Sequence, residues 1–593
     1  MGRGLRSAKR AVKARATVMK PARATRRARK RRPAHHGRTR RSGAPQNRNP
    51  QFEAIALTVA PGPRESPERS ATRAAQEAGL ARWRVDTVSS DEGQFELVPP
   101  KRAKRITPGA AWDAVYRLRA QPQVIHAEPL FKYNVADVQQ PPASRAAGGG
   151  DDPATAGNFE WSLQNANVID AWALFDSGQP GAGVTIGHPD TGFTPHPDLA
   201  DPERLLVPEG FDFDDDDPNP IDDLDDEFLD NPGHGTGTGS VIVSNRGPAP
   251  GLPPPAFVSG AAPFASLIPI RTTESVVLFS MRGLRRAIDH AVSKKAHVIS
   301  ISLGGPLPSP ALKAAIRRAT DAGVIVLAAA GNQVGVVVFP AAFDETIAVA
   351  ASTFDDEEWA GSSRGDAVDI SAPGASVWRA RVERGSDGGF DFSVNRGNGT
   401  SFAVATTAGV AALWVSFHGF KNLVSRYGAA QIARVFKSLL QSTCRTPPGW
   451  DTANFGPGIV DARALLAAPL PDAPPVRKLR DPQRAAIAMD ATGLETFVHL
   501  MPDVPRAQVE RGLAAILHVS DRQLPRALQD VGDELAFQLV MHPQLEKAVR
   551  LAGLPTARPA TAARAAGMAL PSGVASTRLR VWIRRSPRSA KRI

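Results

Sequence analysis

The sequence has few residues of the kinds that would cross-link the chain or carry it across a membrane. Cys444 is its single cysteine, so no disulfide can form within the chain. Cysteine content therefore does not indicate whether the protein lies in an oxidising or a reducing compartment. No run of eighteen or more apolar residues occurs, which argues against a membrane-spanning helix. Yet 42% of the 593 residues are hydrophobic, enough for at least one sizeable core and for two to four domains.

Acidic residues are missing from both ends of the chain. Residues 1–50 hold 18 Lys or Arg residues and residues 577–593 hold seven, and neither stretch contains Asp or Glu. Without these 25 charges the net charge of +13 becomes −12, so a mildly acidic body lies between two basic ends. We predict that the ends are disordered and solvated, in preference to binding nucleic acid or an anionic membrane. A third interpretation places the true start downstream, for instance at Met19.

A secretory signal is also missing. Such a signal needs roughly 7–15 apolar residues after a short basic region, and residues 1–50 contain no such run. The predicted localisation is therefore cytoplasmic, with secretion as the alternative if the start is misassigned. The enrichment in Ala, Arg and Pro is typical of a GC-rich bacterial gene.

Changes in composition and hydrophobic pattern divide the chain into segments. The predicted order is a basic disordered tail (1–50), a small α+β unit (51–135), a linker rich in Pro, Gly and Asp (136–158), an α/β domain (159–468), a second Pro-rich linker (469–482), a helical region (483–553) and a basic, disordered tail (554–593). In the helical region we expect helices at 505–518, 521–532 and 534–551.

The predicted class of residues 159–468 rests on short apolar runs that alternate with helical stretches. Runs such as VTIGH (184–188) and VIVLAAA (324–330) are typical of strands buried on both faces of a parallel sheet. The stretches between them, for example 310–322, fit crossover helices. The fold class is therefore α/β.

Three local motifs could carry chemistry. Asp190 ends the strand in VTIGHPDTG, at the carboxyl edge where ligands gather in such sheets. His234 lies among glycines in NPGHGTGTG, and Ser401 opens a helix of small residues in GNGTSFAVATTAG, at the positive end of the helix dipole. Taken singly, each has a plain structural interpretation as a turn Asp, a structural His or an N-cap Ser. Together they supply the carboxylate, imidazole and hydroxyl that serine-catalysed hydrolysis requires.

These motifs, in the order Asp, His, Ser, resemble the active-site signatures of the subtilases, and the resemblance covers roughly 159–468. It implies a subtilisin-like domain with a mostly parallel central sheet, and a serine endopeptidase whose triad is Asp190, His234 and Ser401. By the same resemblance, Asn332 in AAAGN is the oxyanion donor. The segments similar to those lining the family's substrate cleft contain Ser302, Leu303, Gly304, Gly305, Ala329, Ala330 and Gly331, and the glycines of SLGG would offer an open edge on which substrate pairs as an added strand.

Residues 52–133 resemble a subtilase propeptide, above all in AWDAVYRLRAQPQVIHAEPLF. The resemblance implies a zymogen whose propeptide first chaperones folding and then occupies the cleft as an intramolecular inhibitor. Cleavage would fall in the linker 136–158. The partners expected are thus this propeptide and protein or peptide substrates.

The sequence departs from the family pattern at several positions. Gly237 and Thr238 stand where the family often has His and Val, and Thr406 follows Ala405 where a proline is usual. Neither departure removes a group that transfers protons. We therefore expect the departures to change the packing of the helices and to leave the chemistry intact. His188 lies on the same strand face as Asp190 and is a rival candidate for the base.

Three alternatives remain to be weighed. The run 211–230 holds ten Asp and one Glu; we favour a solvated acidic loop, with a calcium site as the alternative, and the chemistry requires no cofactor. An esterase of the G-x-S-x-G type is excluded because residues 399–403 read GTSFA. A retired protease fold serving as a binding or scaffold protein is disfavoured by the intact triad and Asn332.

Overall fold

The computed structural model describes part of the chain, from residue 50 to residue 584, and from residue 48 onward the chain forms one compact unit. The described ranges are 50–60, 65–101, 105–132, 157–199, 201–224, 231–245, 257–276, 281–333, 335–386, 388–474, 493–554, 570 and 573–584. The predictions for the N-terminal tail, for most of both linkers and for the last residues of the chain fall outside them.

Residues 50–132, here called the N-terminal domain, form an antiparallel sheet with the strand order β2-β3-β1-β4 and two helices. Its elements are β1 (Gln51–Val59), α1 (Pro67–Glu77), β2 (Arg84–Ser89), β3 (Gln94–Val98), α2 (Pro108–Arg119) and β4 (Val124–Lys132). Both helices begin with a proline after a side-chain cap, Ser66 before α1 and Thr107 before α2. This start fits proline because its missing N–H would have no partner in the first turn.

Residues 157–474, here called the central domain, contain a seven-stranded sheet among the described residues, with the order β11-β10-β9-β8-β5-β7-β6 and all strands parallel. The strands are β5 (Thr185–Asp190), β6 (Phe211–Asp212), β7 (Ser266–Arg271), β8 (Val298–Ile301), β9 (Ile325–Ala329), β10 (Ile347–Ser352) and β11 (Ile370–Pro373). A separate hairpin pairs β12 (Val377–Arg384) with β13 (Phe390–Gly397). The predicted α/β class is confirmed.

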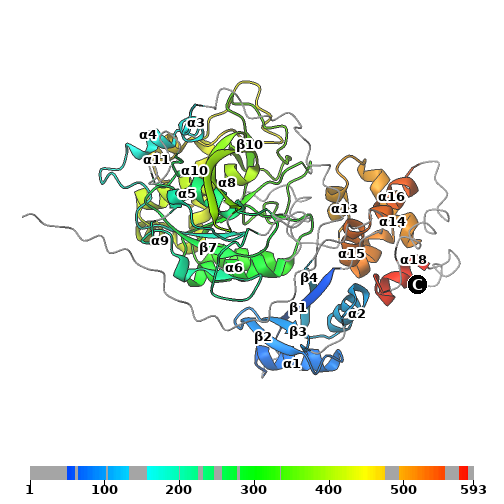
Figure 1. Ribbon diagram of the computed structural model, residues 1–593. Coiled ribbons are helices and arrows are strands. Elements are labelled where there is room, and N and C mark those ends of the chain that lie inside the picture. Colours follow the sequence, from blue (N-terminus) through cyan, green and yellow to red (C-terminus); the bar gives the residue numbers. More distant parts are fainter. Residues whose placement is uncertain are drawn as a thin grey trace, which may run out of the picture. The chain divides into compact units, whose positions relative to one another are not determined.

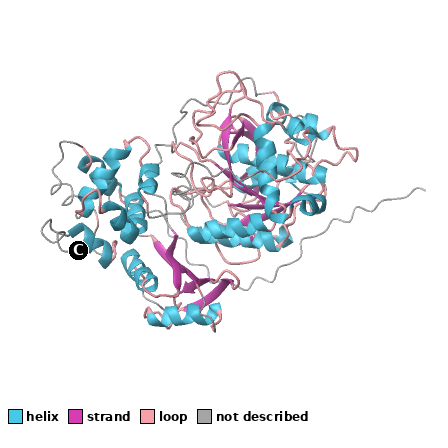
Figure 2. Cartoon of the chain, turned by 180° about the vertical axis from the view of Figure 1, so that it is seen from behind, coloured by secondary structure: helices cyan, strands magenta, loops and turns pink. Residues whose placement is uncertain are grey.

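Helices cover both faces of this sheet, as Figures 1 and 2 show. On one face Val298, Ile325 and Leu327 share a core with α5 (His234–Val243) and α8 (Thr400–His418). On the other, Ile299 and Val326 share a core with α6 (Met281–Ser293) and α7 (Pro310–Asp321). Successive strand residues point to opposite faces, so both faces require apolar side chains, and this accounts for the continuous apolar runs in the sequence.

The remaining helices of the central domain are short. They are α3 (Trp161–Asn165), α4 (Val168–Trp172), α9 (Phe420–Tyr427), α10 (Ile432–Ser442) and α11 (Ala462–Ala467). The longer helix α8 is the one described helix whose length and composition would let it cross a membrane, and 89% of its most apolar window is buried inside the protein. A helix that is apolar on all sides is expected in the middle of a core.

The C-terminal segment, residues 493–584, consists of helices in its described parts. They are α13 (Leu494–Leu500), α14 (Arg506–Leu517), α15 (Leu524–Met541), α16 (Pro543–Ala552) and α18 (Thr577–Arg584). The prediction that one helix ends at 532 and the next begins at 534 is wrong. Helix α15 continues to Met541, and α16 begins at Pro543. The predicted disorder of 554–593 is likewise wrong for α18, where Leu579 and Ile583 lie four residues apart and are buried.

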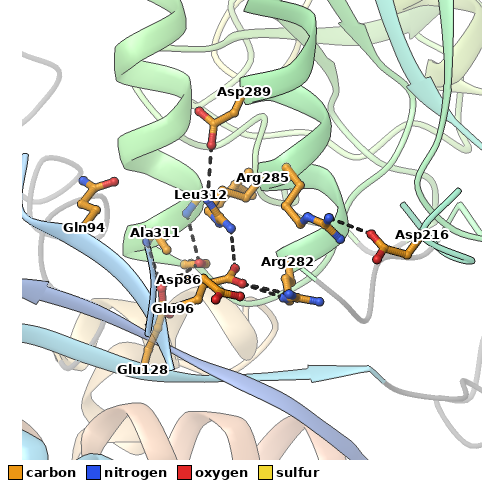
Figure 3. A network of polar contacts seen from close by, with 12 residues as sticks. Asp86, Gln94, Glu96, Glu128, Asp216, Arg282, Arg285, Asp289, Ala311 and Leu312 are labelled. Carbon is orange, nitrogen blue, oxygen red and sulfur yellow. Dashed lines mark hydrogen bonds and ion pairs between the residues drawn. The ribbon is translucent and has the colours of Figure 1, made fainter. Parts of the chain in front are cut away.

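The N-terminal domain contacts the central domain through charged and polar side chains, as Figure 3 shows. Glu96 of β3 is nearly buried and receives hydrogen bonds from Arg282 and Arg285 of α6. Glu128 of β4 accepts the hydroxyl of Ser309 and the N–H of Ala311, both at 2.9 Å, at the first turn of α7. Carboxylates at these positions complement the N-terminal ends of helices.

The docking of Glu128 predicts a pH-dependent stability. Burial raises the pKa of this carboxyl from its ordinary value of 4.5 to about 7, in spite of the two hydrogen bonds, and the nearby charges are those of Arg119 and Asp533. A carboxyl whose pKa is higher in the folded protein stabilises it fully below pH 4.5 and progressively less as the pH rises through 7.

Between about pH 5 and about pH 7 we therefore expect the melting temperature to fall more steeply for the parent protein than for Glu128→Gln, and above about pH 8 the slopes should be alike. The glutamine keeps an acceptor oxygen and cannot ionise. Equal slopes for the two proteins in thermal melts would contradict the assignment.

Candidate active site

Asp190 is the last residue of β5 and is completely buried. Its Oδ1 accepts the N–H of Thr191 at 2.8 Å and lies 2.7 Å from Nδ1 of His234. Burial by itself would raise the pKa of this carboxyl, but the adjacent His234 and the hydrogen bonds lower it below its ordinary value. The carboxylate is thus held as an anion facing the imidazole, an arrangement that fixes the tautomer with the proton on Nδ1.

His234 is the first residue of α5, and its side chain keeps 15% of its surface exposed. The helix begins after Gly233, whose φ of 72° is left-handed and favours glycine. At Gly235 a Cβ would come within 2.0 Å of the carbonyl oxygen of Gly192, so this position also requires glycine. The glycines around His234 therefore bring the start of α5 against the end of β5, which places the imidazole on Asp190.

The second oxygen of Asp190 faces Thr238, for which the sequence gave no catalytic role, and His188, the rival candidate for the base. The hydroxyl of Thr238 lies 3.2 Å from Oδ2 of Asp190 and 3.0 Å from Nε2 of His188. His188 is 1% exposed, and burial lowers its pKa while Asp190 opposes that shift. Nε2 of His188 lies 3.7 Å from Oδ2 of Asp190, whereas His234 makes the 2.7 Å contact with the carboxylate, so His234 is the imidazole placed to act as the base.

Asp222 and Thr191 hold the backbone beside His234. The Oδ2 of Asp222 accepts the N–H of Gly233 at 2.8 Å and the hydroxyl of Thr191 at 2.9 Å. The hydroxyl oxygen of Thr191 in turn accepts the N–H of Gly235 at 3.1 Å. These bonds satisfy the first N–H groups of α5, which no helical carbonyl can reach.

Ser401 lies in the first turn of α8, and Asn332 follows the end of β9. The side-chain oxygen of Asn332 accepts the N–H and the hydroxyl of Thr400, both at 2.9 Å. A Cβ at Gly399 would lie 3.5 Å from Nδ2 of Asn332 and 3.6 Å from the backbone N of Ser401. The side-chain amide of Asn332 and the backbone N–H of Ser401 thus both lie near Gly399, and stabilisation of an oxyanion would need two donors close together in this way.

Helix α5, which begins with His234, packs on helix α8, which carries Ser401 in its first turn. Among the described residues no hydrogen bond joins their side chains. Such catalytic contacts are often long without substrate and tighten when it binds. Asp190 and His234 are therefore paired in the structure, whereas His234 and Ser401 are brought together by the packing of their helices.

The segments predicted to bind substrate lie beside Ser401, but their edge is partly occupied. The hydroxyl of Ser302 lies 3.3 Å from the carbonyl oxygen of Ser401. The N–H of Gly304 donates to Val276 at 3.2 Å, and Gly305 exchanges two hydrogen bonds with Phe339. The open edge predicted from the glycines is thus closed at these two residues, because other backbone groups of the chain satisfy them.

The remaining predicted positions, Leu303 and the turn 329–331, are fixed by backbone contacts and burial. Leu303 is buried in the core under α6 and α7. Ala329 ends β9, and the N–H of Ala330 donates to Val349 of β10 at 2.9 Å. Gly331 has a φ of 109°, and its N–H donates to the hydroxyl of Thr400 at 3.2 Å. The turn therefore holds Asn332 against the start of α8.

Comparisons with known proteins agree with this geometry. The subtilase family model matches residues 181–457. Subtilisin from Bacillus pumilus is 32% identical over 256 residues, which are 42% of this chain and 83% of that protein. The chain belongs to the subtilase family. Subtilisin E from Bacillus subtilis is 33% identical over the same length, and the chain spans 60% of the length of that relative.

A solved structure extends the likeness of the fold beyond the matched family domain. Fervidolysin from Fervidobacterium pennivorans, described as a keratinolytic enzyme related to subtilisin, aligns with a TM-score of 0.52 at 20% identity. The alignment covers 71% of this subtilase chain and 62% of fervidolysin. At this identity the likeness concerns the fold alone.

The acidic run 211–230 is paired with cations in its described residues. Asp212 and Asp215 contact Arg271, Asp216 contacts Arg286, and Asp214 contacts Lys132 of the N-terminal domain. In the parts of this subtilase that the structure describes, no three His, Cys, Asp or Glu side chains gather in a way that could hold a metal ion. Cations from other segments thus pair with four of its aspartates, whereas the side chains of Asp215 and Asp216 remain 66% and 69% exposed, as expected of a solvated loop.

Thr191, Asp222 and Thr238 are site residues whose roles the sequence did not indicate, and His188 was named there only as a rival base. Thr191 follows the Asp of its motif, and Thr238 was noted only as a departure from the family pattern. Asp222 is one of ten aspartates in the acidic run, so no local signal distinguishes it. Each is identified only by the contacts that the fold gives it.

Thr238 provides a test of the network around Asp190. Thr238→Val removes the hydroxyl while keeping the shape, so one oxygen of a buried carboxylate loses its donor. We expect kcat for peptide hydrolysis to fall about tenfold, or about 1.4 kcal/mol in the barrier, with little change in KM.

The matched control is Thr238→Ser, which keeps the hydroxyl and should retain most of the activity. Steady-state kinetics of both variants is the measurement. Equal losses for Val and Ser would show that the methyl packing of Thr238, and not its hydroxyl, supports the site.

Proposed function

We propose that the chain is a serine endopeptidase that hydrolyses peptide bonds through an acyl-enzyme intermediate. The observation that carries the proposal is the 2.7 Å contact between buried Asp190 and His234 on α5, which packs on α8. Ser401 lies in the first turn of α8, and Asn332 is hydrogen-bonded to that turn through Thr400. A carboxylate, an imidazole, a hydroxyl and two oxyanion donors are the groups that this reaction needs.

In the proposed mechanism His234 takes the proton of the Ser401 hydroxyl while Oγ attacks the carbonyl carbon of the scissile bond. The oxyanion that forms accepts hydrogen bonds from Nδ2 of Asn332 and the N–H of Ser401. His234 then donates the proton to the leaving amine, and the amine departs. Water, deprotonated by His234, attacks the acyl group and regenerates Ser401, while Asp190 stabilises the imidazolium in both halves.

Substrate would pair with the chain near Ser302 and Gly304 as an added strand. This pairing requires the N–H of Gly304 to leave Val276, to which it donates in the structure. The chain 274–276 would therefore have to move aside when substrate enters. Protein or peptide substrates in an extended conformation fit this edge, and the side chain preferred at the cleaved bond is set by residues around 329–331.

The N-terminal domain is proposed to act as a propeptide that inhibits the enzyme within the same chain. Its contacts with the first turns of α6 and α7, through Glu96 and Glu128, support this role. Lys132, the last residue of β4, pairs with Asp214 ahead of the linker. Cleavage in 136–158 would then produce the two-piece form from which active enzyme is released.

The proposed chemistry uses side chains alone and calls for no organic cofactor, because His234 moves the protons and Asn332 with Ser401 stabilises the charge. Calcium would have a structural role in such a fold. In the described part of the acidic run, Arg271, Arg286 and Lys132 pair with Asp212, Asp214, Asp215 and Asp216, which makes these four carboxylates poor calcium ligands.

A covalent probe tests the nucleophile. We expect a fluorophosphonate to label the protein after the linker 136–158 has been cut, and we expect Ser401→Ala to remain unlabelled, because the hydroxyl is the atom phosphorylated. Mass spectrometry of the labelled peptide is the measurement. A parent protein that stays unlabelled after cleavage would favour the alternative of a retired fold that serves as a binding protein.

Substitution of Asn332 tests the oxyanion site. Asn332→Ala should lower kcat by roughly 10²–10³-fold with little change in KM, the loss known for removal of one oxyanion donor in subtilisin itself. Gln333→Ala changes the neighbouring exposed residue and is the control. An unchanged kcat in Asn332→Ala would remove this residue from the mechanism.

A further inference from the structure

The N-terminal domain shares its hydrophobic core with the C-terminal segment. One continuous cluster of buried side chains includes Trp112 and Val115 of α2, Phe131 of β4, and Leu535 and Phe537 of α15. The central domain has its own cores. Among its described hydrophobic side chains Leu307 packs against this cluster, and Phe339 contacts His499 of α13 with ring centroids 5.6 Å apart. The two ends of the chain therefore form a single packed body, with α2 beside α15 and α18 in Figures 1 and 2.

Aromatic rings make up the centre of this shared core. Phe537 stacks on Phe131 with ring centroids 4.7 Å apart and meets the edge of Trp112 at 6.1 Å. Trp112 and Tyr116 lie one turn apart on α2 and are 4% and 6% exposed. Burial of a large side chain of this kind stabilises by about 1.5–3 kcal/mol, so loss of the C-terminal segment would uncover a costly apolar face.

Polar contacts fix the register of the two ends. The buried carboxylate of Glu534 accepts the hydroxyl of Tyr116 at 3.0 Å, and also the N–H and the hydroxyl of Ser576. Asp113 accepts the N–H of Thr577 at 2.9 Å and its hydroxyl at 3.1 Å, at the start of α18. Separation of the two ends would take the Tyr116 hydroxyl from Glu534 and the Asp113 carboxylate from Thr577, so these contacts favour association. The bonds from Ser576 lie within the C-terminal segment and hold Glu534 in place.

Gly109 allows the closest approach. Its N–H donates to the carbonyl of Gly573 at 3.0 Å, and a Cβ at this position would lie 2.5 Å from the carbonyl oxygen of Ala575. Gly109 is in the first turn of α2, where a residue with a side chain would be tolerated by the helix itself. The absence of a side chain is thus explained by the C-terminal segment and by nothing within the N-terminal domain.

The N-terminal domain faces its two neighbours with different chemistry. Toward the central domain it presents mainly ion pairs, such as Glu92 with Arg317 and Arg318, and Glu96 with Arg282. Toward the C-terminal segment it presents mainly aromatic and aliphatic side chains. Salt at about 1 M reduces the Debye length to about 3 Å and weakens the first interface, whereas apolar burial is not weakened by salt.

We infer that the C-terminal segment is a binding partner for the chain's own N-terminal domain, which it retains on the molecule after the linker has been cut. The N-terminal domain and the C-terminal segment act as one inhibitory body, and release of the N-terminal domain requires displacement of the C-terminal helices as well. The association itself follows from the packing, and its effect on activity rests on the proposed peptidase function.

The association is tested without activity, in the full chain carrying Ser401→Ala. Cleavage sites for an unrelated protease are placed in both linkers, within 136–158 and within 475–482, and both are cut. In size-exclusion chromatography at about 1 M NaCl we expect the N-terminal and C-terminal fragments to elute together, away from the central domain. A C-terminal fragment that elutes alone, with the N-terminal fragment on the central domain or by itself, would overturn the inference.

Gly109→Ala supplies a specific variant for the same experiment. The added methyl should weaken the association of the two end fragments by about tenfold or more, because it meets the backbone at Ala575. Ala110→Ser, at the exposed next residue, is the control and should bind as the parent does. Tyr116→Phe, which removes only the hydroxyl that Glu534 accepts, should also weaken binding; parent-like affinity in both variants would contradict the interface.

A second measurement separates this inference from the proposed function. With Ser401 intact and only the linker 136–158 cut, Gly109→Ala should release peptidase activity faster than the parent or Ala110→Ser, measured with a fluorogenic peptide. If the end fragments associate as predicted but no variant ever shows activity, the proposed function fails and the interface stands. If activity appears at equal rates in all three, the C-terminal segment has no part in retention.

Discussion

A carboxylate with no access to water must obtain every one of its hydrogen bonds from the protein, and the site of this chain is organised around that requirement at Asp190. The end of β5 places the group where water does not reach it. The start of α5 must then approach closely enough for His234 and Thr238 to serve its two oxygens. That approach is possible only with glycine at positions such as 235, and it is held by Asp222 through Gly233.

The same requirement accounts for two departures from the family pattern that lie beside the carboxylate, His188 and Thr238. A histidine at position 188 brings a second polar ring into a buried strand, and Thr238 is the group that contacts it. A valine at 238 would leave His188 and one oxygen of Asp190 without that hydroxyl. His188 and Thr238 therefore satisfy each other's polar groups inside the core, together with Asp190.

The N-terminal domain illustrates how one small domain can be held by two kinds of force. Its sheet meets α6 and α7 through carboxylates and arginines, whose attraction depends on ionic strength. Its helix α2 meets the C-terminal helices through aromatic packing, which does not. A domain of about eighty residues buries a limited core by itself, and the added helices enlarge it.

Much of the fold and the candidate site could be predicted because the signals were local. Apolar runs indicated the buried strands, glycine-rich turns indicated the close approaches, and the motifs around Asp190, His234, Ser401 and Asn332 indicated the family. Contacts between segments far apart in the chain could not be predicted. The pairing of Thr238 with Asp190, the closure of Gly304 by Val276, and the folding of α18 depend on what lies opposite each residue.

Sequence by itself determined which groups could do the chemistry and where strands and helices would form, since these follow from residue type and short-range periodicity. Tertiary structure alone decided which polar groups share a buried space and which end of the chain covers α2, since burial and electrostatics depend on neighbours that sequence order does not reveal.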